Sequence, residues 1–153
     1  KVKEAVFSMI HFELIGKSFL DLFAGSGQMA IEALSNGAKS ATLVDSNKKS
    51  IGVIKENISK CKCEDSVKVI YSKVESFLRS TNEKFDIIYL DPPYFTDDMD
   101  KVLPLLANVC KDTSVIICET TREKNLPDTV ANFKISKQKR YGKIIITFYR
   151  SEE

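Results

Sequence analysis

The hydrophobic positions of the chain alternate between runs typical of buried strands and spacings typical of helices. Short apolar runs predict strands at SFLDLFA (18–24), SATLVD (40–45), SVKVIYS (66–72), FDIIYLD (85–91) and SVIICET (114–120). Helical spacing predicts helices near the start of the chain and at 27–38, 47–60, 74–79 and 97–110, the last with a kink at Pro104. Strands that alternate with helices predict an α/β fold with a mostly parallel sheet covered on both faces.

The end of the chain follows a different pattern. FKISKQKRYGKIIITFYR (133–150) holds two strand-like runs that are separated by a Tyr141-Gly142 turn signal, without a helix between them. Such a pair is a hairpin, so the last strand should enter the sheet antiparallel to its neighbours. The sequence has no internal repeat or linker, and we expect one domain over residues 1–153.

Composition and cysteine spacing restrict the class of protein. Of 153 residues, 43% are hydrophobic and 29% are charged, which favours a folded globular domain. No apolar run approaches the ~20 residues of a membrane span, and we expect a soluble, cytoplasmic monomer. Cys61 and Cys63 lack the paired spacing of a zinc site and His11 is the single histidine, so we expect no metal.

A glycine-rich turn after the first strand predicts a ligand site. Gly25, Gly27 and Ala30 satisfy G-x-G-x-x-G/A between a strand and a helix, and Asp45 ends the next strand twenty positions after Gly25. This pattern also fits a dinucleotide, so the glycines alone leave a nicotinamide cofactor open.

Asp21 favours a different cofactor. This carboxylate lies inside the first predicted strand, where it is costly to bury without a partner and would repel a pyrophosphate. A cofactor with a cationic amino acid, such as S-adenosylmethionine, would instead be stabilised. Asp45 would then accept both ribose hydroxyls, and the backbone amide of Val74 could meet the adenine edge, although Ser72 and Lys73 stand where an acid often precedes that position.

A second candidate site follows the fourth strand, at Asp91, Pro92, Pro93 and Tyr94. The prolines remove two backbone donors and leave an edge of acceptors, made by the Asp91 carboxylate and the Pro92 carbonyl. Such an edge suits an exocyclic amine that gains positive charge as a methyl group arrives. Tyr94 offers a ring on which a flipped base could stack.

Together these motifs resemble the class I S-adenosylmethionine-dependent methyltransferases. More closely, the chain resembles the bacterial small-subunit (16S) ribosomal RNA guanine-N2 methyltransferase family, through KVKEAVFSMI, FLDLFAGSGQMAIEALSNGA, LVD, FDIIYLDPPY and YGKIIITFY. The resemblance implies a seven-stranded Rossmann-like sheet with an antiparallel last strand. It also implies methylation of a guanine amine in ribosomal RNA or an assembling small subunit.

The resemblance also assigns residues. It places Asp21, Phe23, Gly25, Ser26, Gly27 and Asp45 at the cofactor, and Asp91, Pro92 and Tyr94 at the target amine. Members of the family usually begin with a basic segment before the first helix; because the sequence starts at Lys1 without a Met, we expect that this segment is absent or was trimmed. That places more weight on the basic stretch 134–143 as an RNA contact, in particular on Lys139, Arg140 and Tyr141. The resemblance matches Tyr141 and Gly142 to a position near the target pocket.

Three other functions remain open from the sequence. D-P-P-Y also serves adenine-N6 methylation of DNA or RNA, although the chain has no obvious extra domain that would read a DNA sequence. A non-catalytic binding module that keeps the cofactor fold is a second alternative, and a nicotinamide dehydrogenase is a third.

Overall fold

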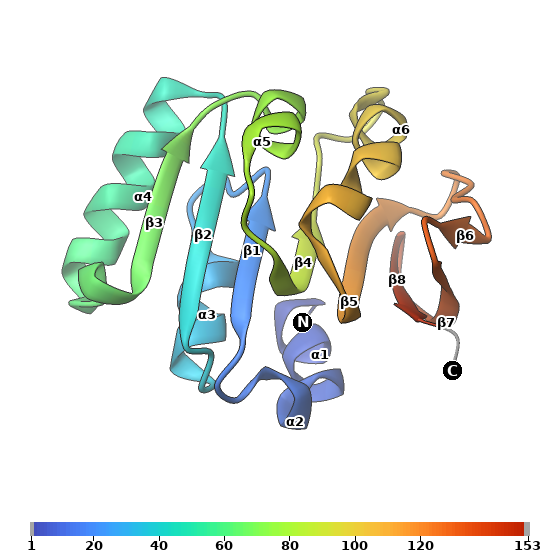
Figure 1. Ribbon diagram of the computed structural model, residues 1–153, viewed down its shortest axis with the longest axis horizontal. Helices are drawn as coiled ribbons and strands as arrows, with labels where there is room; N and C mark the ends of the chain where they lie inside the picture. The colour runs from blue at the N-terminus through green and yellow to red at the C-terminus, as the bar shows by residue number, and fades with distance from the viewer. Residues whose placement is uncertain (1, 152–153) are drawn as a thin grey trace.

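The computed structural model describes residues 2–151, and its centre is one twisted sheet of eight strands in the order β3-β2-β1-β4-β5-β8-β7-β6 (Figure 1). The strands are β1 Ser18–Leu22, β2 Ser40–Asp45, β3 Val67–Tyr71, β4 Phe85–Leu90, β5 Cys110–Thr121, β6 Thr129–Val130, β7 Phe133–Tyr141 and β8 Ile144–Ser151. Strands β1 to β5 pair in parallel, and β8 is antiparallel to both β5 and β7. The expected α/β class and the antiparallel last strand are confirmed.

The sheet has one strand more than the seven that we expected. The additional strand is β6, which pairs only Thr129 and Val130 with Lys134 and Phe133 of β7. Two residues are too few to produce a recognisable alternation of apolar and polar positions, so the sequence pattern does not reveal this strand. The hairpin of β7 and β8 turns at Gly142, as expected.

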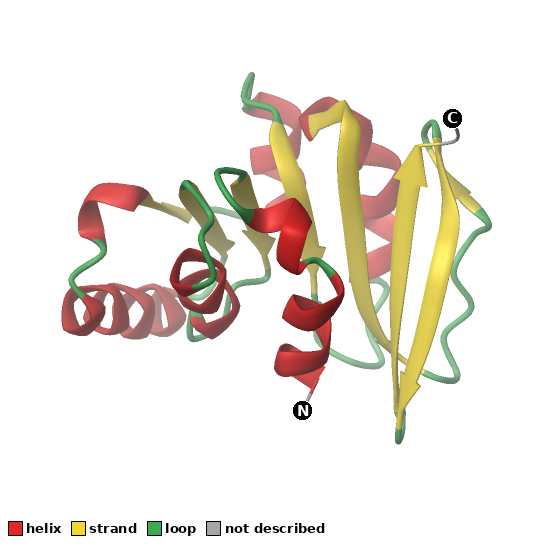
Figure 2. Cartoon of the chain, turned by 90° about the horizontal axis from the view of Figure 1, so that it is seen from below, coloured by secondary structure: helices red, strands yellow, loops and turns green. Residues whose placement is uncertain are grey.

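Helices cover both faces of the sheet (Figures 1 and 2). They are α1 Val2–Met9, α2 His11–Leu14, α3 Gln28–Ser35, α4 Lys48–Cys61, α5 Val74–Ser80 and α6 Asp98–Val102, with short 3-10 helices η1 Glu64–Ser66 and η2 Leu103–Val109. Buried side chains of α1, α3 and α4 pack on one face, and those of α5, α6 and η2 pack on the other. None of the helices in this part of the chain is long and apolar enough to cross a membrane.

The predicted helix over 97–110 is divided rather than kinked. Helix α6 ends at Val102, and η2 continues from Leu103 with Pro104 in its first turn. Proline lacks the N–H that an α-helical hydrogen bond needs and clashes with the preceding turn. The tighter 3-10 geometry therefore replaces the α-helix from this point.

Strand β1 shows how the sequence forms two separate cores. Phe19 belongs to the core on the α1, α3 and α4 face, whereas Leu20 and Leu22 belong to the core on the α5 and α6 face. Side chains alternate between the faces of a sheet, so a strand that is apolar at nearly every position is buried on both sides. Asp21 lies on the same face as Phe19 and is 1% exposed.

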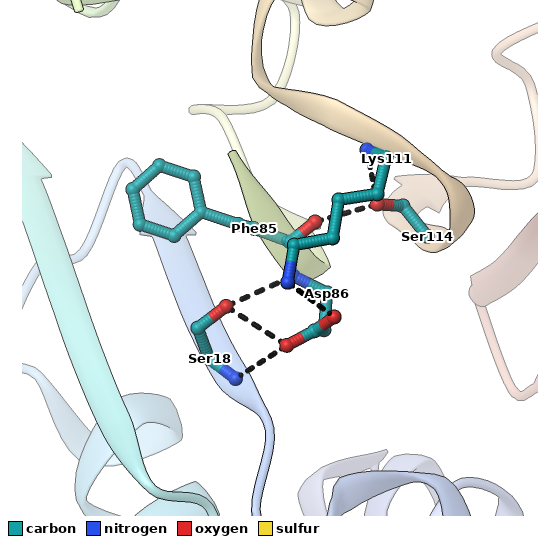
Figure 3. A network of polar contacts seen from close by, with 5 residues as sticks. All are labelled: Ser18, Phe85, Asp86, Lys111 and Ser114. Atoms are coloured by element: carbon teal, nitrogen blue, oxygen red, sulfur yellow. Dashed lines mark hydrogen bonds and ion pairs between the residues drawn. The ribbon is translucent and has the colours of Figure 1, made fainter. Parts of the chain in front are cut away.

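A polar network joins three strands at the end of the sheet where β4 begins (Figure 3). The Asp86 carboxylate accepts hydrogen bonds from the N–H and the hydroxyl of Ser18, at 2.9 and 3.1 Å, and pairs with Lys111 at 2.9 Å. The Ser114 hydroxyl donates to the carbonyl of Phe85 at 2.5 Å. These contacts link β1, β4 and β5 at the end of the sheet opposite the candidate site.

Candidate active site

A cavity of about 960 Å³ lies at the carboxyl ends of β1, β2 and β4, where open α/β sheets bind ligands. It brings together both sites that the sequence indicated. Eight of the predicted site residues line it, namely Phe23, Gly25, Ser26, Asp45, Val74, Asp91, Pro92 and Tyr94. The glycine-rich turn and the D-P-P-Y segment therefore face one shared space.

Asp45 holds the glycine-rich turn in place. Its Oδ2 accepts a 2.9 Å hydrogen bond from the N–H of Gly25, and its Oδ1 accepts one of the same length from the N–H of Asn47. Each carboxylate oxygen has two lone pairs, so each can still accept a ligand hydroxyl. Because the amide of Gly25 is directed at a carboxylate, it is not offered to a pyrophosphate. This geometry fits a ribose better than the phosphates of a nicotinamide cofactor.

The turn itself uses backbone conformations that few residues adopt. Phe23 and Gly25 have φ of 64° and 60°, and Gly27, at the start of α3, has φ of 82°. A Cβ on Gly27 would lie 3.0 Å from the Leu43 side chain. Glycine is therefore required at 27 by both conformation and space. Gly27 is buried and does not line the cavity, so its part in the site is to shape the turn.

Asp21 is a buried carboxylate with an unsatisfied oxygen. Burial, followed by the charge of Asp91, holds its pKa well above the usual range, although a hydrogen bond from the N–H of Ala30 acts in the opposite direction. Among the described residues, its Oδ2 has no hydrogen-bond partner. A buried unpaired acceptor costs free energy, and a cation such as the ammonium of S-adenosylmethionine would relieve that cost. The residues present therefore fit this cofactor.

Val74 occupies the first position of α5. The first N–H groups of a helix have no partner within the helix, so the amide of Val74 is available to a ligand. Its side chain is buried, and the residue lines the cavity together with Lys73 and Glu75. The Ser72 hydroxyl donates to the carbonyl of Lys73 and is not among the lining residues.

Asp91 follows β4 directly and lies partly buried at the mouth of the cavity. Burial, and then the charge of Glu119, raises its pKa to about 7. Within the described residues no donor is hydrogen-bonded to this carboxylate, and Asp91 lines the cavity together with Pro92 and Tyr94. A carboxylate in this state can both accept hydrogen bonds from an amine and take up a proton near neutral pH.

The D-P-P-Y segment continues into an exposed aromatic pair. Tyr94 is 44% exposed and Phe95 is 95% exposed, and Phe95 has φ of 62°. A non-glycine residue in this conformation is strained, and such strain is concentrated at functional sites. The Thr96 hydroxyl donates to the carbonyl of Pro93 at 2.9 Å and stabilises the turn.

Sequence reasoning missed two residues next to this segment, Tyr89 and Glu119. The Tyr89 hydroxyl donates a 2.5 Å hydrogen bond to Oε1 of Glu119, and the Tyr94 hydroxyl lies 3.5 Å from Oε2. Burial and the charge of Glu119 raise the pKa of Tyr89, and they raise that of Tyr94 to about 12, so both phenols stay protonated. The sequence contained one signal for Glu119. It is an acid near the end of the predicted fifth strand, and acids also end the second and fourth predicted strands at Asp45 and Asp91.

The basic candidates lie outside the cavity. Lys139 and Arg140 are exposed on β7, and the half-buried Tyr141 packs against the core on the α1 face. None of the three is among the residues that line the cavity. Tyr141 pairs with Ile144, which pairs with Thr121 at the end of β5, so the tip of the hairpin lies at the same edge of the sheet as Asp91.

The remaining candidates are structural. Among the described residues no group of three or more His, Cys, Asp and Glu side chains could hold a metal ion. Cys118 is buried and Cys110 half-buried, and burial raises the pKa of both thiols to about 12. His11 is exposed in α2 and does not line the cavity.

The strand order, the glycine-rich turn with Asp45 and the D-P-P-Y segment define a class I S-adenosylmethionine-dependent methyltransferase. The chain belongs to the family described as Conserved hypothetical protein 95, whose model matches residues 1–150.

Relatives named as methyltransferases and a solved structure match nearly the whole chain. The chain is similar to Ribosomal RNA small subunit methyltransferase D of Haemophilus influenzae, with 31% identity over 99% of this chain and 80% of the relative. It is 28% identical to the protein of the same name from Escherichia coli K12, over 99% of this chain and 77% of the relative. A solved structure from Streptococcus pyogenes, described as a conserved hypothetical protein, has a TM-score of 0.91 and 36% identity and covers 98% of this chain and 95% of its own.

Proposed function

We propose that this protein methylates the exocyclic N2 amine of a guanine in small-subunit ribosomal RNA, with S-adenosylmethionine as the methyl donor. The observation that carries the proposal is the position of Asp91 and Pro92 in the same cavity as Gly25 and Asp45. An amine held by the first pair would lie beside a cofactor held by the second. The names of the relatives support ribosomal RNA as the substrate class.

The cofactor would be held by groups from β1, β2 and the start of α5. Asp45 would accept from the ribose hydroxyls, the amide of Val74 would meet the adenine, and Asp21 would compensate the positive charge of the amino acid part. When bound, the cofactor supplies a methyl group on a positively charged sulfur.

The chain's own contribution at the amine is to hold and polarise it. Asp91 and the carbonyl of Pro92 accept the two amine hydrogens, which frees the nitrogen lone pair from the base ring. The positive charge that grows on nitrogen is then stabilised by the Asp91 carboxylate, in a partly water-excluded site where such an interaction is stronger. After transfer the surplus proton leaves nitrogen, and Asp91 can accept it at neutral pH.

The aromatic pair supports the base. Tyr94 lines the cavity and offers its ring for stacking, which is worth ~1–3 kcal/mol per base in single-strand binding. Phe95 projects almost fully into solvent next to it and would stack on a neighbouring nucleotide. A paired guanine would have to be flipped out, so we expect an unpaired or strained target.

A methyl-transfer assay tests the proposal. The protein is incubated with labelled S-adenosylmethionine and immature small subunits, and the RNA is digested to nucleosides. We expect N2-methylguanosine as the labelled product, and no label with Asp91→Ala. Labelled N6-methyladenosine would support the adenine alternative. Absence of any label, also with a family N-terminal basic segment added, would exclude a methyltransferase function on this substrate.

A calorimetric titration separates the cofactor from the RNA substrate. We expect S-adenosylmethionine to bind and NAD not to bind, because the amide of Gly25 is directed at Asp45 and Asp21 favours a cation. Binding of NAD alone would contradict the interpretation of Asp21. Asp91→Ala should still bind S-adenosylmethionine, which would show that its loss of activity does not come from a lost cofactor.

A further inference from the structure

Glu119 lies beside the target-amine segment without a cationic partner. It is the tenth residue of β5, the strand next to β4. It is half-buried and lies at the same end of the sheet as Asp91. Among residues 2–151 no ion pair involves it, and nearby Lys124 pairs with Asp100 at 2.6 Å. Its negative charge is therefore available to a ligand or to the neighbouring phenols.

Two tyrosines hold this carboxylate toward the D-P-P-Y segment. Oε1 accepts the 2.5 Å hydrogen bond from Tyr89, whose side chain is 2% exposed and fixed within the sheet. Oε2 has only the 3.5 Å contact with the exposed Tyr94 hydroxyl, which is long for an O–H···O bond. One oxygen is thus fixed by the protein, and the other keeps most of its accepting capacity.

Glu119 lies next to the D-P-P-Y segment, which forms one wall of the cofactor cavity. Pro92, Pro93 and Tyr94 line both the large cavity and a second cavity of about 40 Å³, which Glu119 also lines. That volume is too small for a base, so a base stacked on Tyr94 would present only its edge toward Glu119. The electrostatic effect of Glu119 on Asp91 agrees with this proximity.

The edge of guanine matches two neighbouring carboxylates. Guanine carries the N2 amine next to a ring N1–H, so both groups are donors. Adenine carries its N6 amine next to a ring N1 that is an acceptor, and a carboxylate opposite that nitrogen would meet a lone pair. A site that places an acceptor against the wrong base leaves polar groups unpaired and rejects it.

We propose that Glu119 accepts the N1–H of the target guanine while Asp91 and Pro92 hold its N2 amine, and so selects guanine over bases whose ring nitrogen at this position is an acceptor. This inference rests on the proposed function, because it assumes an N2 amine at Asp91. It assigns to Glu119 a role in specificity that neither the glycine-rich turn nor D-P-P-Y supplies, since both would serve adenine equally.

2-Aminopurine tests the predicted contact. It has the same 2-amine as guanine, but it lacks the 6-oxygen and its N1 is an acceptor. Small-subunit RNA is assembled from synthetic pieces so that the mapped target position carries either base, and kcat/KM is measured for each. For the wild-type protein we expect guanine to be favoured by about 10- to 100-fold, the value of a hydrogen bond to a charged group.

Glu119→Gln should change this preference. The amide oxygen can still accept from Tyr89, while the amide nitrogen can donate to an acceptor N1. We expect activity on guanine to fall and the guanine to 2-aminopurine ratio to drop at least about tenfold. Tyr89→Phe is the matched control, because it removes the tyrosine contact and keeps the carboxylate, and it should retain the preference for guanine.

The outcomes separate this inference from the proposed function. Cofactor affinity and melting temperature, measured for each variant, show whether the fold is kept. If the wild type methylates guanine and Glu119→Gln leaves the ratio unchanged, the role of Glu119 is wrong and the proposed function stands. If Tyr89→Phe also lowers the ratio, Tyr89 positions the carboxylate, and the result for Glu119→Gln still decides the role of Glu119. If the wild type methylates adenine and not guanine, both are overturned.

Discussion

The N–H of Gly25 donates a 2.9 Å hydrogen bond to the carboxylate of Asp45, and this contact joins the turn after β1 to the end of β2. It gives Asp45 two functions, since the residue fixes the turn and faces the cavity. A substitution at Asp45 should therefore affect both the shape of the turn and the binding of a ribose.

Asp45→Ala should weaken S-adenosylmethionine binding by about 10- to 100-fold, because acceptors for the ribose are lost and the Gly25 amide is left without its partner. Isothermal titration calorimetry measures this change. Asp65→Ala, an exposed aspartate in η1 before β3, is the control and should bind the cofactor like the wild type. Equal affinity of the Asp45 variant would contradict the assignment.

The activity should depend on pH through Asp91. Because burial and Glu119 raise its pKa to about 7, the carboxylate is largely protonated below that pH and can no longer accept both amine hydrogens. We expect kcat/KM to fall by about tenfold for each pH unit below 7 and to level off above it, as the titration of a single free-enzyme group requires.

Glu119→Gln provides a check on the cause of this pH profile. It removes the second contribution to the raised pKa of Asp91, so the midpoint of the profile should move to lower pH. The buried carboxyl of Asp21, which interacts electrostatically with Asp91, is present in both the wild type and Glu119→Gln. A flat profile between pH 5 and 8 for the wild type would rule out Asp91 as the group that must be ionised.

Lys139 and Arg140 should contribute to RNA affinity rather than to catalysis. The double substitution of Lys139→Glu and Arg140→Glu should raise KM for RNA several-fold and leave cofactor affinity unchanged. It should also make RNA binding less dependent on salt, because each phosphate contact adds about 0.7–0.9 to the slope of log K against log salt concentration. Filter binding at several salt concentrations measures this.

The control carries the same change of charge at the opposite end of the molecule. Lys60→Glu with Lys62→Glu alters two exposed lysines at the end of α4. It should leave RNA affinity and its salt slope nearly unaltered. If both double variants lose affinity equally, the effect comes from net charge and the hairpin is not a specific RNA contact.

Gly27→Ala should destabilise the protein. The new methyl group would meet Leu43 at 3.0 Å, and the φ of 82° is unfavourable for alanine. We expect a loss of about 1–3 kcal/mol in the free energy of unfolding, measured by urea titration. Gly52→Ala is the control, because Gly52 lies inside α4 with open space around it, and there the substitution should stabilise by about 0.5–1 kcal/mol.

Asp86→Asn should destabilise the fold in a pH-dependent way. Although burial alone would raise the pKa of Asp86, hydrogen bonds from Ser18 and Lys111 hold it below its usual range. Its stabilising contribution is therefore fully present above the unfolded pKa of about 3.9 and is lost as the pH falls through the lower folded pKa. At pH 7 we expect a loss of about 1–3 kcal/mol.

A measurement of unfolding free energy at several pH values tests the Asp86 network. The difference between the wild type and Asp86→Asn should shrink as the pH is lowered toward 3, because the Asp86 carboxyl of the unfolded wild type takes up a proton below about pH 3.9 and this favours unfolding. A difference that stays constant down to pH 3 would mean that the asparagine disturbs packing instead. Lys68→Met, which removes an exposed ion pair with Glu83, should change stability by less than about 1 kcal/mol at any pH.

Local patterns in the sequence were sufficient to predict most of the framework. The alternation of strands and helices, the hairpin at Gly142 and the turn at Gly25 all depend on residues close together in the chain. They were predictable because side-chain periodicity and backbone preference act over a few residues. The two-residue strand β6 and the break at Val102 were missed or misjudged, since pairing across the sheet and local helix geometry determined them.

The sequence by itself determined which carboxylates stand at or near the ends of strands, namely Asp21, Asp45, Asp91 and Glu119. The tertiary structure decided which of them meet. Placing β4 between β1 and β5 brings Asp91 close enough to Asp21 and Glu119 for their charges to interact, and it buries an oxygen of Asp21 without a partner. These residues are far apart in the chain, so only strand order and burial could bring them together and set the electrostatics of the candidate site.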